Sequence, residues 1–358
     1  MPHNDLQPPH PIHRAKRRRG HRRRLKRHYR FLLFVLALLL IAAVLNTLFA
    51  KIFDSDTQQD SVPSVADASV EELVVSSLPT VPEAPTPIYT LSSTENTISL
   101  DSEIQSEYAV LIELDTGAIV AKKSAESCIN PASMTKVLTL LVAAEQITDT
   151  DGTFTMTREI ADYCYTNECS VVGYEVGEEI PIIELFFGCI LCSGADACLA
   201  LAELASGSHD AFVDLMNIKI QELGLSETTH FTNCVGIYDE EHYCTVEDMA
   251  LLMRAAIEDD FCKSVLSTAV YTSEATDEHP EGQVLSNWFL RRIEDQGTGD
   301  ITVSCGKTGY VPESGNCAVS YGETSTGSGY ICVTGNGSSS WQVIYDHAAL
   351  YQNYCATA

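Results

Sequence analysis

The sequence predicts an α+β domain in which strands from the two ends of the folded region share one sheet. Short runs rich in β-branched and aromatic residues lie near Tyr108 and again after Ile301, whereas the residues between them carry longer apolar patterns with helical spacing. Strands at both ends with helices between them are typical of an antiparallel sheet flanked by helices. With 358 residues and 45% hydrophobic residues, the chain can bury a sizeable core and still carry extra segments.

The first 50 residues predict a membrane anchor. Residues 1–30 hold 11 Lys and Arg and one acidic residue, and residues 31–50 have only Asn46 and Thr47 as polar side chains. About 20 apolar residues span a bilayer, and a basic flank marks the cytoplasmic side. We therefore expect a basic cytoplasmic tail (1–30) and a transmembrane helix (31–50). A cleaved signal peptide is the alternative, but the apolar run is long for one, and Leu48 stands where a small residue is preferred.

The next segment, residues 51–102, predicts an acidic, disordered stalk. It is rich in Ser, Thr, Asp and Glu, with five prolines between positions 63 and 87. The folded domain is then expected at 103–358, outside the membrane. Residues 31–358 contain 48 acidic and 11 basic residues, a balance that disfavours nucleic acid as a partner.

The folded domain opens with a predicted β-hairpin. Tyr108–Glu113 and Ala118–Lys123 are β-prone, and Asp115-Thr116-Gly117 between them is a turn signal. Pro131 suits a first helical position, and the apolar run Val137–Ala144 continues as a helix. Further helices are predicted over Ile182–Leu191, Ala195–Leu204, Ala211–Leu223, Val246–Ile257 and Trp341–Tyr354, and further strands over Ile301–Ser304, Asn316–Tyr321 and Tyr330–Thr334.

Thirteen cysteines are present, and their irregular spacing disfavours a disulfide scaffold. Most lie in apolar stretches, where a thiol acts as a small buried hydrophobe. Cys189 and Cys192 have a spacing seen in zinc and redox sites, but no second pair with matching spacing follows. The sequence therefore predicts no metal site.

Three short segments could carry chemistry. In Pro131-Ala132-Ser133-Met134-Thr135-Lys136, the hydroxyl of Ser133 and the amine of Lys136 are three residues apart, which places them on one face of a helix. A serine becomes a nucleophile when a base takes its proton, and a lysine with a lowered pKa can be that base. An ordinary helix start with a surface lysine is the structural alternative.

The other two segments are equally weak in isolation. Lys307-Thr308-Gly309 lies in a predicted strand, where the glycine would let a substrate backbone approach and the other two side chains could hold a carboxylate. A turn at a strand end is the alternative. Ser193-Gly194-Ala195-Asp196 lies between two predicted helices, where Ser193 could pass a proton or cap the following helix.

Together, in this order, the segments match the set known from β-lactamases and penicillin-binding proteins. Residues 108–354 resemble the D-alanyl-D-alanine carboxypeptidase family of low-molecular-mass penicillin-binding proteins. The resemblance implies the penicillin-binding protein and serine β-lactamase fold, an α+β fold with a helical subdomain. It extends over about 250 residues and includes Asn130–Lys136, Gly177-Glu178, Glu184–Cys198, Phe212–Leu225, His230–Gly236, His242–Ala250, Gly306–Tyr310 and Gly315–Cys317.

The resemblance implies a role for each matching residue. Ser133 would attack the D-Ala-D-Ala bond of a peptidoglycan stem peptide and form an acyl-enzyme that water hydrolyses, with Lys136 as base and Ser193 passing the proton to the leaving D-alanine. Lys307 and Thr308 would hold the terminal carboxylate. Backbone N–H groups of Ser133 and Tyr310 would form the oxyanion hole beside Gly309. β-Lactams would be covalent inhibitors, and neither a metal nor an organic cofactor is implied.

Two departures from the family pattern concern the site. Ala195 stands where the family has Asn, and Val311 stands where it has Thr two residues after the Lys-Thr-Gly triplet. A lost buried hydrogen bond costs about 1–3 kcal/mol, so activity could be weaker or differently specific. Arg291 or Arg292 could add positive charge near the carboxylate, although an exposed structural role is the simpler expectation.

Three other functions are alternatives to a carboxypeptidase. Ala195 keeps open a catalytically weak protein that binds penicillin or peptidoglycan. A class A β-lactamase would carry a Glu-x-x-Leu-Asn segment between Ser193 and Lys307, and none is present. A Ser-His-Asp hydrolase lacks its Gly-x-Ser-x-Gly motif, so the five remaining histidines are expected at the surface or in packing: His209, His230, His242, His279 and His347.

Overall fold

The computed structural model describes residues 89–355. The predicted cytoplasmic tail, the predicted transmembrane helix and residues 51–88 of the predicted stalk lie outside the described residues. Between residues 89 and 355, no helix combines the length and the apolar character needed to cross a membrane.

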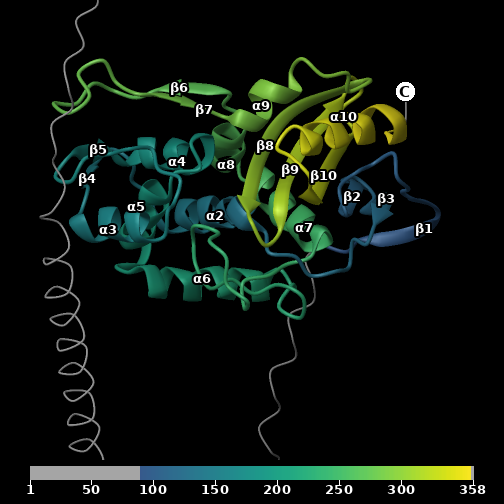
Figure 1. The fold of residues 1–358 in the computed structure, drawn as a ribbon, viewed down its shortest axis with the longest axis horizontal. Helices are drawn as coiled ribbons and strands as arrows, with labels where there is room; N and C mark the ends of the chain where they lie inside the picture. The colour runs from purple at the N-terminus through teal and green to yellow at the C-terminus, as the bar shows by residue number, and fades with distance from the viewer. Residues whose placement is uncertain (1–88, 356–358) are drawn as a thin grey trace, which may run out of the picture. The chain divides into compact units, whose positions relative to one another are not determined.

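One half of the described domain is a six-stranded sheet with the order β1-β3-β2-β10-β9-β8 (Figure 1). Its strands are β1 (Ser92–Ser99), β2 (Tyr108–Glu113), β3 (Ala118–Lys123), β8 (Ile301–Val311), β9 (Gly315–Thr324) and β10 (Gly329–Gly337). The predicted hairpin is confirmed, since β2 and β3 pair antiparallel. The central pairing of β2 with β10 joins the two ends of the folded chain, as the strand pattern predicted.

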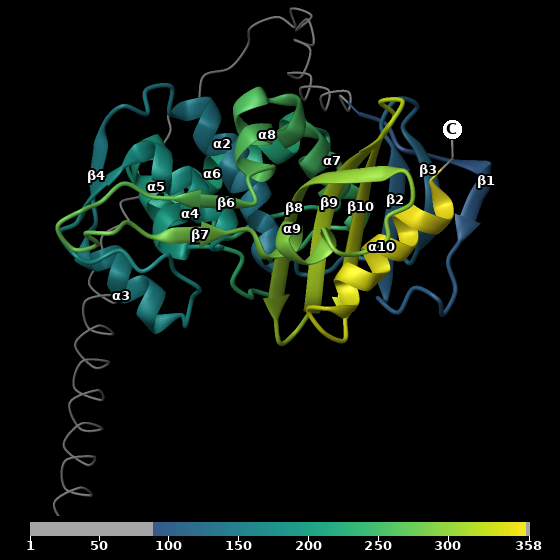
Figure 2. The same ribbon diagram turned by 90° about the horizontal axis from the view of Figure 1, so that it is seen from above.

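The other half consists of helices that pack on one another and on the sheet (Figures 1 and 2). They are η1 (Ala132–Thr135), α2 (Lys136–Gln146), α3 (Arg158–Thr166), α4 (Ile182–Leu191), α5 (Ala195–Ser206), α6 (His209–Glu222), α7 (Val246–Glu258), α8 (Asp260–Leu266), α9 (Trp288–Ile293) and α10 (Gln342–Tyr354). Two small antiparallel pairs complete the described part: β4 (Thr153–Thr155) with β5 (Glu179–Pro181), and β6 (Val270–Thr272) with β7 (Val284–Ser286).

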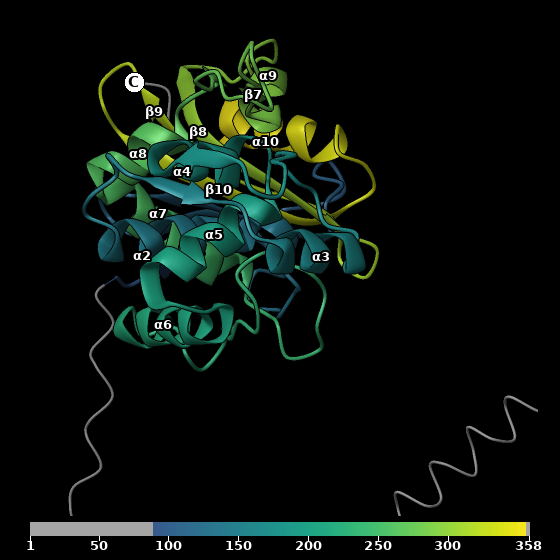
Figure 3. The ribbon, with the colours of Figure 1, turned by 90° about the vertical axis from the view of Figure 1, so that its left-hand side faces the viewer.

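Helices cover both faces of the large sheet. Side chains alternate between the faces of a strand, and in β2 Ala109 and Leu111 pack in the cluster beneath α10, while Val110 and Ile112 join the main core on the other face. Figure 3 shows α9 and α10 together on one side of the strands. Because helices cover both faces of the sheet, β2 is buried on both sides, which explains its unbroken run of apolar residues.

Two sequence expectations about the sheet are wrong. The predicted stalk includes residues 92–99, which instead form β1, and β1 pairs parallel with β3, so the sheet is mixed rather than antiparallel. Almost every residue of β1 is exposed. A polar edge strand buries too little apolar surface to be distinguished from a disordered segment by its composition, which is why the boundary at 102/103 was misplaced.

Most predicted helices are confirmed to within a few residues, but three short helices were not predicted. These are α3, α8 and α9, which have nine, seven and six residues. Polar side chains cap them: Thr157, Asp259 and Asn287 accept hydrogen bonds from backbone N–H groups of the first turn. Short helices carry little apolar periodicity, so their caps are their main sequence signal.

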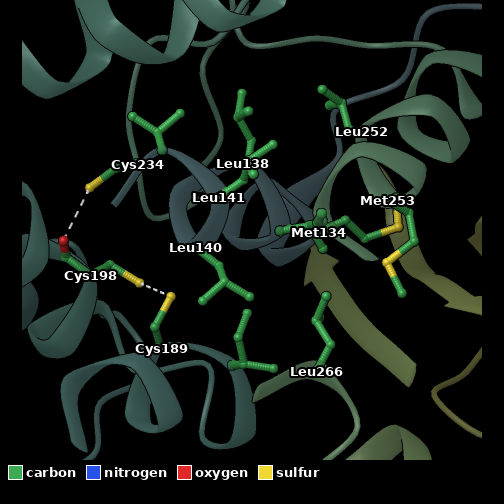
Figure 4. Close-up of a cluster of buried hydrophobic side chains, with 14 of the residues drawn as sticks. Met134, Leu138, Leu140, Leu141, Cys189, Cys198, Cys234, Leu252, Met253 and Leu266 are labelled. Carbon is green, nitrogen blue, oxygen red and sulfur yellow. Dashed lines mark hydrogen bonds between the residues drawn. The ribbon is translucent and has the colours of Figure 1, made fainter. Parts of the chain in front are cut away.

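The main hydrophobic core surrounds α2, whose apolar side chains contact those of α4, α5, α7 and α8 (Figure 4). Cysteines contribute to it, and nine of the thirteen are buried. Cys189 and Cys198 lie with their sulfur atoms 3.1 Å apart beneath Leu140 in Figure 4. The expectation that most cysteines act as small hydrophobes is confirmed.

The C-terminal helix is fastened to the sheet by buried polar groups. His347 is fully buried, and its two ring nitrogens contact Ser320 Oγ at 2.7 Å and Thr334 Oγ1 at 3.1 Å. Burial lowers the pKa of His347 to about 3, so the ring is neutral at physiological pH. Asp346 beside it accepts hydrogen bonds from Ser106 N at 2.8 Å, Ser106 Oγ at 2.6 Å and Gln105 N at 3.1 Å.

Replacing Asp346 with Ala should lower the free energy of unfolding by about 2–3 kcal/mol, because the buried N–H and hydroxyl of Ser106 would lose their acceptor. Urea unfolding of the full chain measures this change. Asp295→Ala, at an exposed position, is the matched control and should change stability by less than about 0.5 kcal/mol. Equal effects of the two substitutions would show that Asp346 does not fasten α10.

Candidate active site

Ser133 and Lys136 lie together at the junction of η1 and α2. Ser133 belongs to the 3-10 turn, and Lys136 is the first residue of the α-helix. The amine of Lys136 donates a hydrogen bond to Ser133 Oγ at 3.1 Å and another to the carbonyl of Val235. Lys136 is buried rather than a surface residue, so the alternative of a helix start with a surface lysine is wrong.

The turn that carries Ser133 is held in an unusual conformation. Ala132 has φ +48°, a left-handed value that non-glycine residues rarely adopt and that is often found at functional sites. Asn130 Oδ1 accepts from Ala132 N at 3.0 Å, and the carbonyl of Ala132 accepts from Thr135 Oγ1 at 2.7 Å. A Cβ on Gly236 would lie 2.0 Å from that carbonyl, so only glycine fits there.

His242 packs against this turn and contacts both Asn130 and Thr135. It is buried, stacks on Phe231, and its Nε2 lies 2.8 Å from Thr135 Oγ1, while its carbonyl accepts from Asn130 Nδ2 at 2.9 Å. Burial lowers the pKa of His242 to about 3, so the ring carries no charge at neutral pH. The expectation that this histidine serves packing is confirmed.

Lys307 enters the site from β8 and reaches Ser193. Its amine donates to Ser193 Oγ at 2.9 Å and to the carbonyl of Thr308 at 2.8 Å, and only 2% of the residue is exposed. Burial, and secondarily the charge of Lys136, lowers the pKa of Lys307 to about 7. Desolvation disfavours the charged amine, and a neighbouring cation adds to that effect.

Ser193 lies between α4 and α5 with φ +56°, again in the left-handed region. The N-cap of α5 is Gly194 and no side chain caps that helix, so the alternative in which Ser193 caps it is wrong. Asp196, near the start of α5, instead binds the loop before α4, accepting from Val172 N at 2.9 Å and Gly173 N at 3.0 Å. The strained backbone thus directs the Ser193 hydroxyl toward Lys307.

Gly309 is the place where β8 meets the serine turn. A Cβ there would lie 2.9 Å from Ser133 N, 3.0 Å from Ala132 Cβ and 2.7 Å from Cys317 Sγ. The sequence predicted that this glycine admits a substrate backbone. In the structure it admits the turn that carries the nucleophile, and neighbouring Tyr310 stays 60% exposed at the mouth of the site.

Two cavities meet at Ser133. The first, of about 280 Å³, is lined by residues that include Ser193, Thr308, Gly309 and Arg292. The second, of about 420 Å³, is lined on the other side of the serine by residues that include Lys136 and Ala195. Ser133, Ser170 and Tyr310 line both. Substrate can therefore extend in two directions from the hydroxyl.

The two departures from the family pattern both lie in the second cavity. Ala195 is 1% exposed and offers only a methyl group beside Lys136, and Val311 borders the same space. The substitutions thus remove polar groups from this cavity and leave its serine–lysine pair in hydrogen-bonding contact.

Sequence reasoning missed several lining residues. Ser170, in the loop before α4, borders both cavities, and Tyr238 and Glu313 border the second. They lie in segments without a motif or an apolar periodicity. The only signal that could have placed them in the site is that they lie near segments that resemble the family's motifs.

Replacing Gly309 with Ala should slow acylation of Ser133 by about 100-fold, because the added Cβ pushes the serine turn away from β8 and a displacement near 1 Å costs that much. A time course of covalent labelling with a fluorescent penicillin measures the acylation rate. Gly297→Ala, whose Cβ would meet its nearest neighbour at 3.5 Å, is the control and should label normally. Unchanged labelling of Gly309→Ala would mean that the turn tolerates a wider separation.

The lowered pKa of Lys307 predicts a pH-dependent stability. Between pH 7 and the usual lysine pKa, the unfolded chain holds a proton that folded Lys307 has released, so folding is favoured as pH rises. Relative to Lys307→Met, the unfolding free energy of the wild type should increase by up to about 1.4 kcal/mol per pH unit between about pH 7.5 and 9. Urea denaturation at several pH values tests this, and a difference independent of pH would contradict it.

Comparison with known proteins identifies the family of this chain. Residues 94–338 match the model of peptidase family S11, described as D-alanyl-D-alanine carboxypeptidase. D-alanyl-D-alanine carboxypeptidase DacF of Bacillus subtilis is 37% identical over 152 residues, which cover 42% of this chain and 38% of that protein. The carboxypeptidase of Streptomyces sp. strain K15 is 29% identical over 212 residues, covering 57% of this chain and 72% of that one.

Solved structures show the same fold. The Streptomyces K15 DD-transpeptidase aligns with a TM-score of 0.64 and 25% identity over 70% of this chain and 97% of that chain. Penicillin binding protein 5 of Haemophilus influenzae aligns with a TM-score of 0.61 and 26% identity over 70% of each chain. The chain spans about two fifths of the length of the first curated relatives it matches. Because the family model covers more than half of this sequence, the chain belongs to the D-alanyl-D-alanine carboxypeptidase family.

Proposed function

We propose that this protein is a serine-type D-Ala-D-Ala carboxypeptidase that trims peptidoglycan stem peptides through an acyl-enzyme and is inhibited by β-lactams. One observation carries the proposal. Two buried lysines, from a helix and from a strand 171 positions later, each donate a hydrogen bond to a serine, and both serines border the cavity that contains Thr308 and Gly309. The family membership and the names of the relatives support the same reaction.

Ser133 is the nucleophile in this proposal. Its Oγ would attack the carbonyl carbon of the penultimate D-alanine while Lys136, 3.1 Å away, takes the hydroxyl proton. A lysine accepts a proton only as a neutral amine. The hydrogen bonds of Lys136 go to Ser133 Oγ and to the carbonyl of Val235, and within residues 89–355 it forms no ion pair.

Ser193 and Lys307 would complete the proton path. The departing D-alanine needs a proton on its nitrogen. Ser193 borders the first cavity, and its Oγ lies 2.9 Å from the amine of Lys307, so the hydroxyl could pass this proton. Water would then attack the acyl-enzyme carbonyl, and the ester bond to Ser133 Oγ would break with return of the proton to that oxygen. No step calls for a metal or an organic cofactor.

The remaining site residues would bind the substrate. The N–H groups of Ser133 and Tyr310 are our candidates for the oxyanion hole, because the absence of a side chain at Gly309 lets β8 approach Ser133 N closely. Lys307 and Thr308 would bind the terminal carboxylate, and Tyr310 would cover the bound peptide.

A catalytically weak penicillin- or peptidoglycan-binding protein is the second candidate function. The observation that favours it is Ala195, which places a methyl group in the second cavity, also lined by Lys136, at the position where the family has Asn. A β-lactamase is a less favoured outcome, since no Glu-x-x-Leu-Asn segment lies between Ser193 and Lys307.

The location is also a proposal. Residues 31–50 would span the cytoplasmic membrane once with the basic tail inside, and the acidic segment from 51 to the start of β1 would separate the catalytic domain from the membrane. The basic residues before position 31 and the apolar run 31–50, with only Asn46 and Thr47 as polar side chains, support this orientation. The catalytic domain would then face peptidoglycan outside the membrane.

Labelling of the full-length protein with a fluorescent penicillin, followed by assay of D-alanine release from a stem pentapeptide, tests the proposal. The wild type should be labelled and should release D-alanine. Ser133→Ala should do neither, because alanine has no hydroxyl oxygen to form the acyl-enzyme ester. Ser264→Ala, at an exposed serine, should behave as the wild type.

The outcomes separate the candidate functions. Labelling without D-alanine release would favour the penicillin-binding protein. Fast hydrolysis of a chromogenic cephalosporin would favour the β-lactamase. Labelling that persists in Ser133→Ala would reject the site.

A further inference from the structure

A third cavity, of about 790 Å³, adjoins the second one at the end of α3. Cys164 and Cys169 both line it. Cys169 also lines the second cavity, together with Ser133 and Lys136. Cys169 is partly exposed, whereas Cys164 is only 4% exposed. One thiol therefore borders the catalytic space, and a second thiol lies behind it.

The backbone at the end of α3 brings these two cysteines side by side. The helix has its C-cap at Asn167, and Glu168 after it has φ +51°, a left-handed value. Cys169 N donates to the carbonyl of Cys164 at 3.0 Å, and Glu168 N donates to that of Tyr165 at 3.4 Å. These are the two hydrogen bonds of a Schellman motif, in which the side chains at the positions of the two cysteines commonly contact each other.

The two thiols form a hydrogen bond, which changes their acidity in opposite directions. This hydrogen bond lowers the pKa of Cys169, and the positive charge of Lys136 adds to the effect. The same hydrogen bond, together with burial, raises the pKa of Cys164. Because the thiolate is the nucleophile in thiol chemistry, the accessible cysteine is the one that reacts first with a molecule from solution.

The positions of the two residues also suit a disulfide bond. Disulfides join residues whose Cα atoms lie about 4.4–6.8 Å apart and whose side chains face each other. A backbone hydrogen bond between the two residues and a contact between their thiols meet both requirements. Cys189 and Cys198 are close as well, with their sulfur atoms 3.1 Å apart, but both are fully buried in the core (Figure 4). Cys164 and Cys169 differ from that pair because a cavity gives access to them.

The residue after the pair connects it to the catalytic segment. Ser170 lines the first and second cavities, and its carbonyl accepts from Ala195 N at 2.8 Å. A bulky group attached to Cys169 would therefore occupy space beside Lys136 and press on this wall. A bond from Cys169 to Cys164 adds no atoms to the cavity, so the catalytic space would stay open.

We infer that Cys164 and Cys169 form a redox-active dithiol that reacts with small-molecule disulfides and closes an internal disulfide bond in the wall of the second cavity. Cys169 Sγ attacks one sulfur of the small disulfide, the S–S bond breaks, and a first thiol leaves. Cys164 Sγ then attacks Cys169 Sγ in the mixed disulfide, and a second thiol leaves. The two cysteines are oxidised, the small disulfide is reduced to two thiols, and each leaving sulfur takes a proton that a cysteine has released.

This activity is separate from the proposed peptidase reaction, since it needs neither Ser133 nor Lys307. Its effect is to clear adducts from the catalytic cavity, because Cys164 displaces any group that becomes attached to Cys169. The proposed location outside the membrane supports the inference, since small disulfides persist in such oxidising surroundings.

The test treats the full-length protein with oxidised glutathione at about pH 8, where thiolates form readily. Remaining thiols are then alkylated, and the peptides are mapped by mass spectrometry without reduction. The wild type should contain a Cys164–Cys169 disulfide and no lasting adduct on Cys169. Cys164→Ser should carry a stable glutathione adduct on Cys169, because the second attack cannot occur. Cys128→Ser, at an exposed cysteine that lines a different cavity, is the control and should form the same internal bond as the wild type.

A second readout is the rate of covalent labelling of Ser133 by a fluorescent penicillin. Glutathione-treated Cys164→Ser should label at least about 10-fold more slowly than its untreated form, since the adduct fills the cavity and displaces its wall. Reduction with dithiothreitol should restore the rate. The treated wild type should keep the labelling rate of the untreated protein.

Thermal midpoints show whether each variant is folded, and Cys164→Ala replaces Cys164→Ser if the serine is not tolerated at this buried position. A lasting adduct on Cys169 in the wild type would overturn the inference, as would the absence of both the adduct and the internal disulfide. An equally fast labelling of the treated and untreated Cys164→Ser would reject the place of the adduct in the catalytic cavity. A wild type that is not labelled by penicillin would instead reject the proposed function, and the peptide map would still decide whether the disulfide forms.

Discussion

The close contact between β8 and the serine turn is the constraint on which the site depends. Lys136 and Ser133 lie on the helical half of the domain, whereas Lys307 lies on the sheet, and the two halves meet where Gly309 approaches Ser133 N. A side chain at position 309 would separate them, since its Cβ would fall within 3.0 Å of three other atoms. The cavities on either side of Ser133 exist because this contact holds the sheet and the helices together at the site.

The amines of Lys136 and Lys307 are both buried in one site, which is electrostatically unfavourable, and no carboxylate among the described residues forms an ion pair with either. Within the described residues neither lysine has an ion-pair partner, and their hydrogen bonds go to hydroxyl and carbonyl oxygens instead. Lys307 responds with a pKa lowered to about 7. Such a site can move protons near neutral pH, since a group that gains and loses a proton readily is suited to acid–base work.

The backbone around the site stores strain that the surrounding packing maintains. Ala132 and Ser193 both have left-handed φ values, and each precedes or bears a hydroxyl that borders the first cavity. Asn130, Thr135 and Gly236 hold the first turn, and the contacts of Gly194 and Asp196 with the Val172 loop hold the second. The cation that lines the first cavity, Arg292, comes from α9, which packs against β8 at Gly306.

The sequence alone indicated the candidate site residues and most of the elements. Ser133, Lys136, Ser193 and Lys307 were predicted from motifs, because the proposed roles each require one residue type within a characteristic segment. The long helices and buried strands were predicted because their apolar patterns are strong. Only the tertiary structure decided that β1 joins the sheet, that Ser193 faces Lys307 rather than caps α5, that Gly309 admits the serine turn, and that Arg292 rather than Arg291 faces the cavity. Each of these depends on contacts between segments far apart in sequence, and a local pattern carries no information about which distant atoms will lie beside it.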